Sequence, residues 1–593
     1  MQTAETLLAV IRERGTKGLP IERVYRMLYN KELYLKAYAK LYPNKGAMTP
    51  GVTPETVDEM SIDKIDNIIE AVRNERYQWK PVKRTYIPKA NGKLRPLGLP
   101  TWSDKLLQEV IRSILDAYYD LQFSEHSHGF RQARGCHTAL QEMQKTWRGT
   151  KWFIEGDISQ YFDTIDHSRL LEILAEKIKD NRFLNMIQGL LKAGYLEDWK
   201  YNHTYSGAPQ GGVLSPLLSN IYLDRLDQYI EKTLIPKYTK GDRKAENPAY
   251  LKIQTMKRAA KNRNDQDAFK KLTKQMQKLP SQDPNDPNYT RLKYVRYADD
   301  FLLGVTGPKV LAEEIKLQIG DYLSSNLKLK MSQEKTLITN ATQEAAKFLG
   351  YEVQCLHCDT KQTGGKRSIN GLIGLRVPKN ITEKKKTKFM HDGKPVHLNY
   401  HLESGDYSII TEYQMELQGL VQYYVLAYNV CSLSHLKHIM QESLVKTLAC
   451  KHRITSKKVY ANYSGTVVSE DGKVLKCIRV DVKREGKKPL VATFGGFSLK
   501  RKPTARIVDQ TPKPINTRTE ILQRLLADTC EICGSSQNVE VHHIRKMSDL
   551  KKQGTEPKTG WKALMAKRRR KTLVVCKTCH SAIHSGKPIK YPL

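Results

Sequence analysis

The sequence predicts a multidomain α/β protein, and three observations support this fold class. The chain has 593 residues, more than a single hydrophobic core normally supports. Between about residues 81 and 360, short apolar runs such as 151–158 and 292–305 alternate with helical patterns such as 168–178. The stretch 407–446, by contrast, has its apolar residues at helical spacing alone. We therefore expect a mixed α/β region followed by a helical one.

Two further segments differ from this pattern. Residues 1–80 are predicted to be helices with breaks at 15–20 and 43–54, where glycine and proline cluster. Residues 231–290 hold fourteen Lys or Arg against seven Asp or Glu, and few large apolar residues. We expect an exposed helical insertion there, ending in a loop. The pattern alone leaves open whether the insertion contacts nucleic acid or is only a solvated face.

The charge of the chain indicates a polyanionic partner. Ninety-nine Lys and Arg against sixty-two Asp and Glu give a net charge of +37, which is typical of proteins that bind a phosphate backbone. The mean hydropathy is −0.57, and no run of about eighteen apolar residues is present, so no membrane association is expected. The first residues carry early charges, unlike a secretory signal. We expect a cytoplasmic, intracellular protein.

Acidic residues lie where predicted strands end. In LKYVRYADDFLLG, β-type runs flank Asp299 and Asp300, which predicts a hairpin with adjacent carboxylates at its tip. A second run, KWFIEG, ends just before Asp157. Adjacent carboxylates at such a position need a cation, and Mg²⁺ prefers carboxylate oxygens. One reaction that uses such a site is nucleotidyl transfer, which employs two Mg²⁺ ions. We predict that Asp157 and Asp299 bridge two Mg²⁺ ions and that Asp300 is the weaker or outer ligand.

The motifs around these residues resemble a known family, the reverse transcriptases encoded by group II introns. Seven segments occur in the order of that family: NKGAMTPGV at 44–52, GKLRPLGLPTWSDKLLQ at 92–108, HSHGFRQARGCHTAL at 126–140, GDISQYFDTIDH at 156–167, GAPQGGVLSPLLSNIYL at 207–223, YADD at 297–300 and KFLGYEV at 347–353. The resemblance implies a right-hand polymerase fold. Its expected regions are fingers and palm at 1–360, including the N-terminal extension 1–80, a helical thumb or maturase domain at 361–460, and a basic DNA-binding region at 461–520.

The resemblance also assigns substrate-binding roles by position. Lys93 and Arg95 correspond to finger cations that hold the incoming triphosphate, and Arg131 to a phosphate or template contact. Phe162 matches an aromatic gate that would exclude a 2′-hydroxyl. Gln210 matches a residue beside the nascent base pair, and Lys335 a cation near the phosphates. One departure is that Gln132 and Ala133 stand where the family would have Pro and Gly.

The C-terminal region, residues 521–593, combines two metal-binding patterns. Cys530 and Cys533 form one C-x-x-C pair and Cys576 and Cys579 another, a spacing that suits a structural, tetrahedral Zn²⁺. The histidines resemble the HNH endonuclease motif of a ββα module, and the resemblance assigns them as follows: His543 the general base, and His542, His580 and His584 ligands of Mg²⁺ or a similar divalent ion. A zinc ribbon that only binds DNA remains the alternative.

The resemblance implies a group II intron reverse transcriptase that binds intron RNA, assists splicing, nicks target double-stranded DNA and makes cDNA from dNTPs by target-primed reverse transcription. It would then act as a ribonucleoprotein associated with the nucleoid. One alternative is an RNA-binding splicing cofactor with an inactive polymerase. Another is the reverse transcriptase of a different retroelement.

Overall fold

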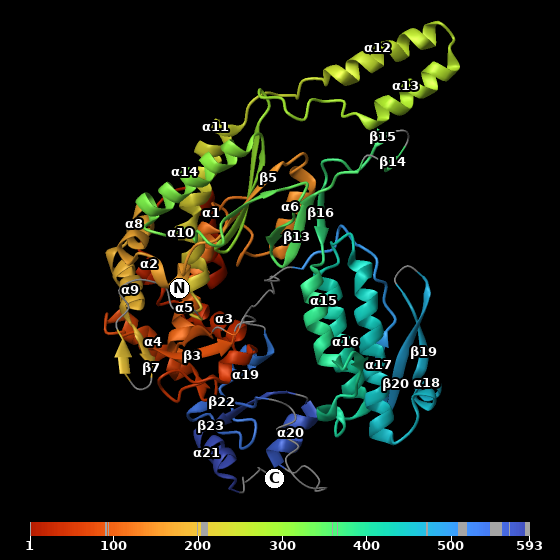
Figure 1. The fold of residues 1–593 in the computed structure, drawn as a ribbon. Helices are drawn as coiled ribbons and strands as arrows, with labels where there is room; N and C mark the ends of the chain where they lie inside the picture. The colour runs from red at the N-terminus through yellow and green to blue at the C-terminus, as the bar shows by residue number, and fades with distance from the viewer. Residues whose placement is uncertain are drawn as a thin grey trace.

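The computed structural model describes residues 2–88, 92, 94–197, 200–202, 211–358, 360–363, 366–469, 472–484, 486–507, 519–545, 560–568 and 570–587. Lys93 and Gln210 therefore lie outside the described residues. The chain forms a large N-terminal body, a helical lobe beside it, a long helical projection and a C-terminal module that lies against the N-terminal helices (Figure 1). No helix in the described ranges is long and apolar enough to cross a bilayer.

The first part of the body is a helical lobe with a sheet at its edge. Its helices are α1 (Ala4–Thr16), α2 (Val24–Met27), α3 (Lys31–Leu41), the 3₁₀ turn η1 (Lys45–Met48), α4 (Ile62–Arg73) and α5 (Trp102–Tyr119). Fourteen residues of α5 are buried, and Thr101 caps this helix by accepting a hydrogen bond from the Asp104 N–H. The edge sheet has the order β4–β3–β7–β8, from β3 (Val82–Pro88), β4 (Leu94–Leu99), β7 (Tyr195–Glu197) and β8 (Lys200–Asn202).

The centre of the body is a four-stranded antiparallel sheet, the palm, in the order β11–β5–β10–β9. Its strands are β5 (Trp152–Gly156), β9 (Arg291–Tyr297), β10 (Asp300–Thr306) and β11 (Leu337–Asn340). In β10, Phe301, Leu303 and Val305 join the core of the N-terminal lobe, and Leu302 joins the core of the helical lobe. Because alternate side chains of a strand point to opposite faces, the palm sheet separates two cores. Both faces of β10 are therefore buried, and its sequence is a nearly continuous apolar run.

Helices surround the palm. They are α6 (Cys136–Thr146), α7 (Tyr161–Thr164), α8 (His167–Lys177), α9 (Asn181–Lys192), α10 (Ser215–Tyr229), the π-helical turn η2 (Ile230–Leu234), α11 (Ile235–Tyr238) and α14 (Lys309–Leu327). Helix α14 buries a residue every three or four positions from Ala312 to Leu327, which is the spacing of one helical face packed on a core. A short parallel pair, β1 (Ile21–Glu22) with β6 (Ile178–Lys179), ties the N-terminal lobe to this layer.

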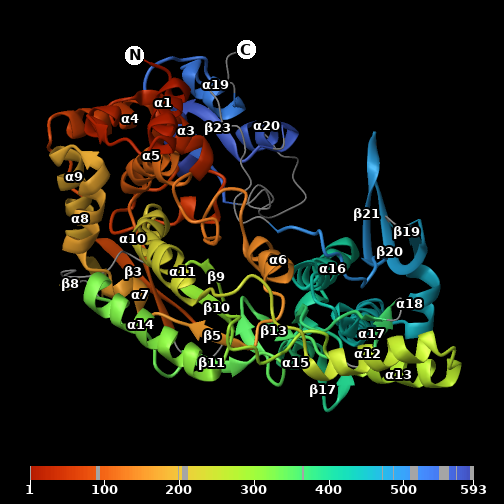
Figure 2. The same ribbon diagram turned by 90° about the horizontal axis from the view of Figure 1, so that it is seen from above.

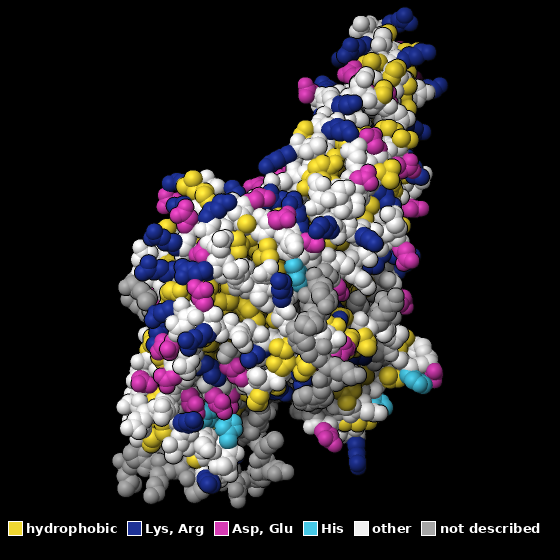
Figure 3. Space-filling view, turned by 90° about the vertical axis from the view of Figure 1, so that its left-hand side faces the viewer, with side chains coloured by type: hydrophobic (Ala, Val, Ile, Leu, Met, Phe, Trp, Pro, Cys, Tyr) yellow, Lys and Arg dark blue, Asp and Glu magenta, His cyan; other side chains and the backbone are white. Residues whose placement is uncertain are grey.

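The basic insertion is a helical hairpin that projects from the palm. Helices α12 (Pro248–Asn262) and α13 (Gln266–Lys278) pack against each other at the top of Figure 1, and isolated bridges at Lys240–Thr290 and Glu246–Gln282 close its base. No residue of α13 is buried. In the space-filling view, Lys and Arg side chains are distributed along the projection among hydrophobic and a few acidic ones (Figure 3). The structure thus presents a cationic, solvent-exposed hairpin above the Lys240–Thr290 bridge, whereas residues 231–238 of the predicted insertion belong to η2 and α11 and bury Leu234 and Tyr238 in the core of the body.

The helical lobe contains the predicted thumb and more. Its helices are α15 (Lys379–Lys386), the 3₁₀ turns η3 (Thr387–Phe389), η4 (Asn399–His401) and η5 (Val430–Ser432), α16 (Asp406–Tyr423), α17 (Leu433–His452) and α18 (Ser456–Tyr463). Small strands join it to the palm: β12 (Ala346–Phe348), β13 (Tyr351–Cys355), β14 (Gln362–Thr363), β15 (Lys366–Arg367), β16 (Ile373–Arg376), β17 (Met390–His391) and β18 (Lys394–Pro395). In Figure 2 this lobe lies across from the N-terminal helices.

The segment after residue 460, where the resemblance implies a separate basic region, is a sheet up to residue 495. It forms the antiparallel sheet β19–β20–β21, from β19 (Ser464–Val468), β20 (Val474–Arg484) and β21 (Lys487–Gly495). Ile478 and Phe494 of this sheet share a core with Leu417 of α16 and Leu444 of α17. Because these apolar contacts join sheet and helices, the residues up to about 495 belong to the helical lobe, and the predicted boundary at 460 divides one packed unit.

The C-terminal module is built on the N-terminal lobe. It contains α19 (Glu520–Leu526), β22 (Val539–His543), α20 (Gly560–Arg568), β23 (Thr572–Cys576) and α21 (Lys577–Ser585). Strand β2 (Met60–Ser61) of the N-terminal lobe pairs with β22 and extends its sheet to β2–β22–β23. Leu525, Val541 and Val574 belong to the same core as the N-terminal helices. Figures 1 and 2 both show the module beside α3 and α4.

Candidate active sites

Three carboxylates lie at one end of the palm sheet. Asp157 follows the last residue of β5, and Asp300 begins β10. These strands pair with Phe301 opposite Gly156, so Asp157 and Asp300 leave the same end of neighbouring strands. Asp299 lies in the two-residue turn between β9 and β10. The fold therefore brings together the three carboxylates that the sequence predicts.

The turn that carries Asp299 packs closely against a neighbouring loop. Tyr297 pairs with Asp300, and Ala298 begins the turn with a φ of 56°. Positive φ at this position matches the twist of a tight hairpin. Gly129 lies against the turn, where a Cβ would fall 2.4 Å from the Ala298 nitrogen. A glycine at 129 is therefore needed for the loop to reach the turn.

The electrostatics of the three carboxylates favour a cation. Burial raises the pKa of Asp300 to about 6, and the neighbouring Asp299 and Asp157 add to the rise. Burial likewise raises the pKa of Asp299. Lys335 compensates part of this charge, since its Nζ lies 2.8 Å from Asp157 Oδ2. Crowded carboxylates repel one another unless a cation sits among them, and oxygen donors suit Mg²⁺. The donor set thus fits the predicted Mg²⁺ ions.

A buried ion pair supports the turn, and the sequence analysis missed it. Arg296 and Asp227 are both fully buried, with Arg296 Nη2 2.6 Å from Asp227 Oδ2. Arg296 also donates to the Ala298 carbonyl at 2.8 Å and to Asn220 Oδ1 at 3.1 Å. The Tyr294 hydroxyl donates to Asp227 Oδ1 at 2.7 Å. The feature of the sequence that could have indicated this ion pair is Arg296 itself, a charged residue inside an otherwise apolar strand.

The predicted substrate-binding residues are placed unequally around the carboxylates. Arg95 lies exposed on β4, and its charge opposes the rise in the Asp299 pKa, so it stands near enough to act on this site. Phe162 on α7 is half-buried and packs edge-on against Tyr161, with ring centroids 5.3 Å apart. Lys335 contacts Asp157 directly. Arg95 and Lys335 therefore border the carboxylates, whereas the described ring contact of Phe162 is with Tyr161.

Arg131 has a different role from the predicted phosphate contact. Its side chain is only 5% exposed, and its Nε lies 2.8 Å from Asp120 Oδ1. The remaining nitrogens donate to the backbone carbonyls of Asp120, Ser124 and Ser127 at 2.6 to 3.0 Å. Because all three nitrogens are engaged, Arg131 holds the loop that leads to Gly129, and no donor is directed toward a substrate.

The C-terminal module brings three histidines together. His542 lies on β22, and His580 and His584 lie one turn apart on the same face of α21. His542 Nδ1 is 2.9 Å from His580 Nε2, which is 3.0 Å from His584 Nε2. Burial lowers the pKa of His542 to about 4, so this ring is neutral and offers a lone pair. The cluster fits the predicted divalent ion.

Glu540 and His542 point to one face of β22, whereas Val541 and His543 point to the other, because strand side chains alternate. Glu540 Oε1 lies 2.6 Å from His580 Nδ1 and so directs His580 Nε2 into the cluster. Such carboxylate–histidine pairs orient metal ligands. His543 instead faces the N-terminal lobe: its Nε2 is 3.0 Å from the Tyr38 hydroxyl, and burial lowers its pKa to about 3.

Asp58 enters the histidine cluster from the N-terminal lobe, and no local pattern indicated this. Its carboxylate oxygens lie 3.6 Å from His542 Nδ1, 3.3 Å from His580 Nε2 and 3.0 Å from His584 Nε2. Burial alone would raise the pKa of Asp58, but hydrogen bonds from His580 and the His543 N–H lower it to about 2. These four donors lie within 4.8 Å of one another.

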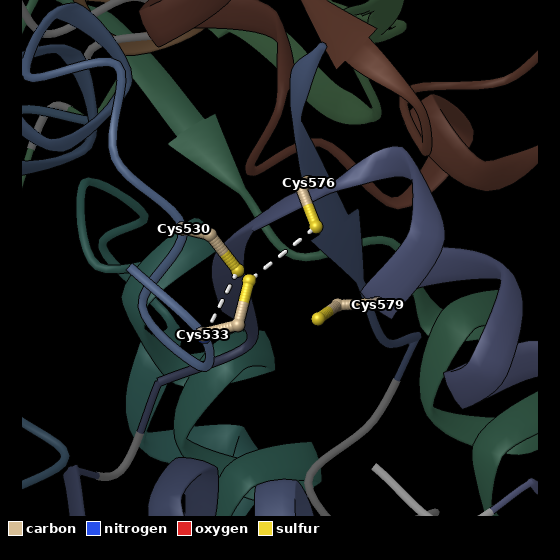
Figure 4. Close-up of side chains that lie close together, drawn as sticks. All are labelled: Cys530, Cys533, Cys576 and Cys579. Atoms are coloured by element: carbon tan, nitrogen blue, oxygen red, sulfur yellow. Dashed lines mark hydrogen bonds between the residues drawn. The ribbon is translucent and has the colours of Figure 1, made fainter. Parts of the chain in front are cut away.

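The four predicted zinc ligands converge beside this cluster (Figure 4). Cys530 and Cys533 lie on the loop after α19, Cys576 ends β23 and Cys579 is in α21. Their sulfurs lie within 4.8 Å of one another, with 3.6 Å between Cys533 Sγ and Cys576 Sγ, and none of the four is in a disulfide. Four thiols at this separation suit Zn²⁺, which binds thiolates tetrahedrally.

Replacing Cys579 with serine should remove about one zinc per chain and loosen the module, because a structural zinc contributes directly to folding. Zinc analysis of the purified protein, with limited proteolysis of residues 519–587, measures both effects. Primer extension by the polymerase should persist, since its carboxylates lie in another lobe. Cys450→Ser, at an exposed cysteine of α17, is the matched control and should retain its zinc. Full zinc retention in Cys579→Ser would contradict the site.

The palm sheet with its carboxylates and the fused ββα module define a reverse transcriptase that carries an endonuclease. The family described as "Reverse transcriptase (RNA-dependent DNA polymerase)" matches residues 87–353. "Type II intron maturase" matches residues 374–493, and "AI2M/AI1M-like, HNH endonuclease" matches residues 530–580. The maturase match extends past residue 460 into β21, in agreement with the shared core of the helical lobe.

Similar proteins give the family. The group II intron-encoded protein LtrA of Lactococcus lactis subsp. cremoris is 38% identical over 95% of this chain and 96% of its own length. A 91 kDa protein in the cob intron of Schizosaccharomyces pombe is 33% identical over 97% of this chain and 71% of its own. The COX1/OXI3 intron 1 protein of Saccharomyces cerevisiae is 33% identical over 95% and 69%. The chain belongs to the group II intron-encoded proteins. It combines a reverse transcriptase, a maturase and an HNH endonuclease domain. This family assignment confirms the resemblance seen in the sequence.

Proposed function

We propose that the protein binds its group II intron RNA, assists splicing, nicks target double-stranded DNA and copies the RNA from the nick. The observation that carries this proposal is that one chain holds two separate centres, a three-carboxylate polymerase edge and a three-histidine nuclease cluster. A nick leaves a 3′-hydroxyl, and a polymerase needs one. The two chemistries therefore follow one another.

Each region takes one part of this work. Residues 1–360 supply fingers and palm, and the helical lobe from 361 to about 495 grips the template–primer duplex and the intron RNA. The cationic hairpin at 231–290 and the basic segment up to 520 add phosphate contacts to RNA or DNA. Residues 521–593 form the nuclease. The net charge of +37 supports an extended nucleic-acid partner.

At the polymerase edge, the primer 3′-oxygen attacks the α-phosphorus of a dNTP, a new P–O bond forms and pyrophosphate leaves. Two Mg²⁺ ions, held by Asp157 and Asp299 with Asp300 as the outer ligand, would supply charge stabilisation for this displacement. Arg95 and Lys335 border the carboxylates and neutralise the triphosphate. Phe162 limits the space beside the sugar. Lys93 and Gln210 stay expectations from the family motifs.

At the nuclease cluster, water attacks a backbone phosphorus, the P–O3′ bond breaks and the 3′-oxygen takes a proton. His543 is the proposed base that accepts the proton from water, and its neutral form suits that task. His542, His580 and His584 would hold the divalent ion, which supplies charge stabilisation at the phosphate. Glu540 fixes the orientation of His580.

Sequencing the RNA that copurifies with the full chain tests the proposed function. A single enriched RNA that flanks the gene and splices faster when protein is added is the expected result. A preparation stripped of nucleic acid at high salt serves as the control, because counterion release drives the binding and becomes less favourable as the salt concentration rises. Recovery of unrelated RNAs without enrichment would overturn the intron assignment and favour another retroelement.

His543→Ala should reduce DNA nicking by about a hundredfold or more, since general-base catalysis contributes about 10²–10⁴-fold. Extension of a preannealed primer should be unchanged, because that reaction uses the palm carboxylates. Nicking of a labelled duplex by the protein–RNA complex, assayed beside primer extension, measures the separation. The matched control is His435→Ala, at an exposed histidine of α17. Nicking at the wild-type rate would remove His543 from the reaction.

A further inference from the structure

Asp58 adds a fourth donor to the three nuclease histidines, and one ligand atom from each of these four residues lies within 4.8 Å of the others. The nitrogens of His542 and His584 lie 2.9 and 3.0 Å from His580 Nε2. Asp58 Oδ1 lies 3.6 Å from His542 Nδ1 and 3.3 Å from His580 Nε2, and Asp58 Oδ2 lies 3.0 Å from His584 Nε2. Metal–ligand bonds of about 2.0–2.1 Å place tetrahedral donors about 3.3 Å apart, so these separations are of the size that a four-ligand metal site requires.

The position of Asp58 is built into the packing of two lobes. Its neighbours Val57 and Met60 are completely buried in the N-terminal lobe. The Glu59 N–H donates to the Val541 carbonyl at 3.2 Å, and the His543 N–H donates to Asp58 Oδ1 at 2.7 Å. Backbone bonds on both sides of the carboxylate therefore hold it in the cluster. A surface side chain in chance contact would lack this support.

The same packing covers the proposed base. His543 is 5% exposed, its Nε2 is hydrogen bonded to the Tyr38 hydroxyl, and its ring lies 6.0 Å from that of Tyr42. A base must reach the attacking water, and a catalytic metal must keep one position open for water or phosphate. Here Asp58 fills the open position and α3 covers the base. The N-terminal lobe therefore blocks both the open metal position and the access of water to the base.

A pocket of about 700 Å³ borders the cluster on its other side, and its walls include His580, His584, Asp63 and Lys64. This pocket gives ions and solvent access to the cluster while His543 stays covered. Metal exchange is therefore compatible with the docked arrangement, whereas DNA cleavage requires a change in it.

We propose that Asp58, carried by the reverse transcriptase lobe, is the fourth ligand of the nuclease metal and closes the site until the DNA phosphate replaces it. This inference rests on the proposed nuclease function of the histidine cluster. If Asp58 closes the site, nicking requires partial release of the C-terminal module from α3 and β2. The nuclease is then inactive in the protein that has not bound DNA. Asp58 lies about 500 residues before the histidines in the sequence, so its coordination would couple the reverse transcriptase lobe to the nuclease.

Metal titration of the full chain tests the ligand. The protein is first loaded with Zn²⁺ at its cysteines and then titrated with Co²⁺, whose visible absorption is strong in four-coordinate sites and weak with added waters. Wild type should bind one Co²⁺ per chain with the strong spectrum. Asp58→Asn, which keeps a hydrogen-bond acceptor for the His543 N–H, should bind about tenfold more weakly or worse and lose the strong absorption. Asp63→Asn, an exposed carboxylate in the same pocket, is the matched control and should behave as wild type.

Nicking by the same proteins at saturating metal tests the closure. Asp58→Asn should nick duplex DNA severalfold faster than wild type, with an unchanged melting temperature. Equal Co²⁺ affinity in Asp58→Asn and wild type would overturn Asp58 as a ligand. Weaker affinity with slower nicking would overturn the closure and make Asp58 a working ligand. If wild type binds no Co²⁺ beyond its zinc, the nuclease assignment itself fails, which separates the two proposals.

Discussion

Asp299→Ala should abolish DNA synthesis, with a loss of at least about a thousandfold. The carboxylate would hold the Mg²⁺ ions that stabilise the displacement, and that stabilisation is worth several kcal/mol, or about tenfold in rate for each 1.4 kcal/mol. Binding of RNA should be unchanged, because Asp299 lies in a two-residue turn and its carboxylate would serve Mg²⁺ and not the template. Primer extension with Mg²⁺ and a filter-binding assay measure the two properties.

The control for this experiment is Asp321→Ala, which removes an exposed carboxylate from α14. It should synthesise DNA at the wild-type rate. Residual synthesis by Asp299→Ala within tenfold of wild type would remove Asp299 from the site. A wild-type protein that makes no product at all would instead support a splicing cofactor with an inactive polymerase.

Asp227→Ala should lower the free energy of unfolding of the palm by about 3–5 kcal/mol, the range expected when one partner of a buried ion pair is removed. Arg296 would then lie fully buried without the carboxylate that pairs with it and that holds its pKa above the usual value. The turn before Asp299 should also loosen, because Arg296 donates to the Ala298 carbonyl. Hydrogen exchange in β9 and β10 measures the loss locally, which is needed because a multidomain protein has no single free energy of unfolding.

A double variant separates charge from packing. Asp227→Leu combined with Arg296→Met replaces both partners with apolar side chains of similar size, which is often neutral or stabilising at buried pairs. We expect protection of the strands to recover, while DNA synthesis stays reduced because the Ala298 contact is lost. A loss of less than about 1 kcal/mol in Asp227→Ala would show that solvent reaches Arg296.

Much of the site was predictable because its residues are close in sequence. A run of apolar residues followed by an acid predicts a carboxylate at a strand end, as at Asp157, and an Asp pair between two strands predicts a hairpin tip, as at Asp299. Two C-x-x-C pairs predict a metal cluster whatever the surrounding fold. These patterns depend on local geometry, which neighbouring residues determine.

Predictions that depended on the partner of a side chain were less successful. Arg131 was expected to reach a phosphate, yet its nitrogens bind Asp120 and three backbone carbonyls. The family resemblance implies a boundary at residue 460, whereas Ile478 and Phe494 share a core with the thumb helices. Charge and composition indicate that a side chain has a partner, but the tertiary packing determines which residue that partner is.

The sequence by itself indicated the chemistry that we propose for this protein: three carboxylates for a polymerase, four histidines for a nuclease, four cysteines for a zinc ion, and a basic surface for nucleic acid. Only the tertiary structure decided how these parts are joined. Asp58 and Tyr38 reach the nuclease, and Asp227 reaches Arg296, through contacts between residues far apart in the chain. Such contacts leave no period or spacing in the sequence, because they follow from the packing of separate elements on a common core.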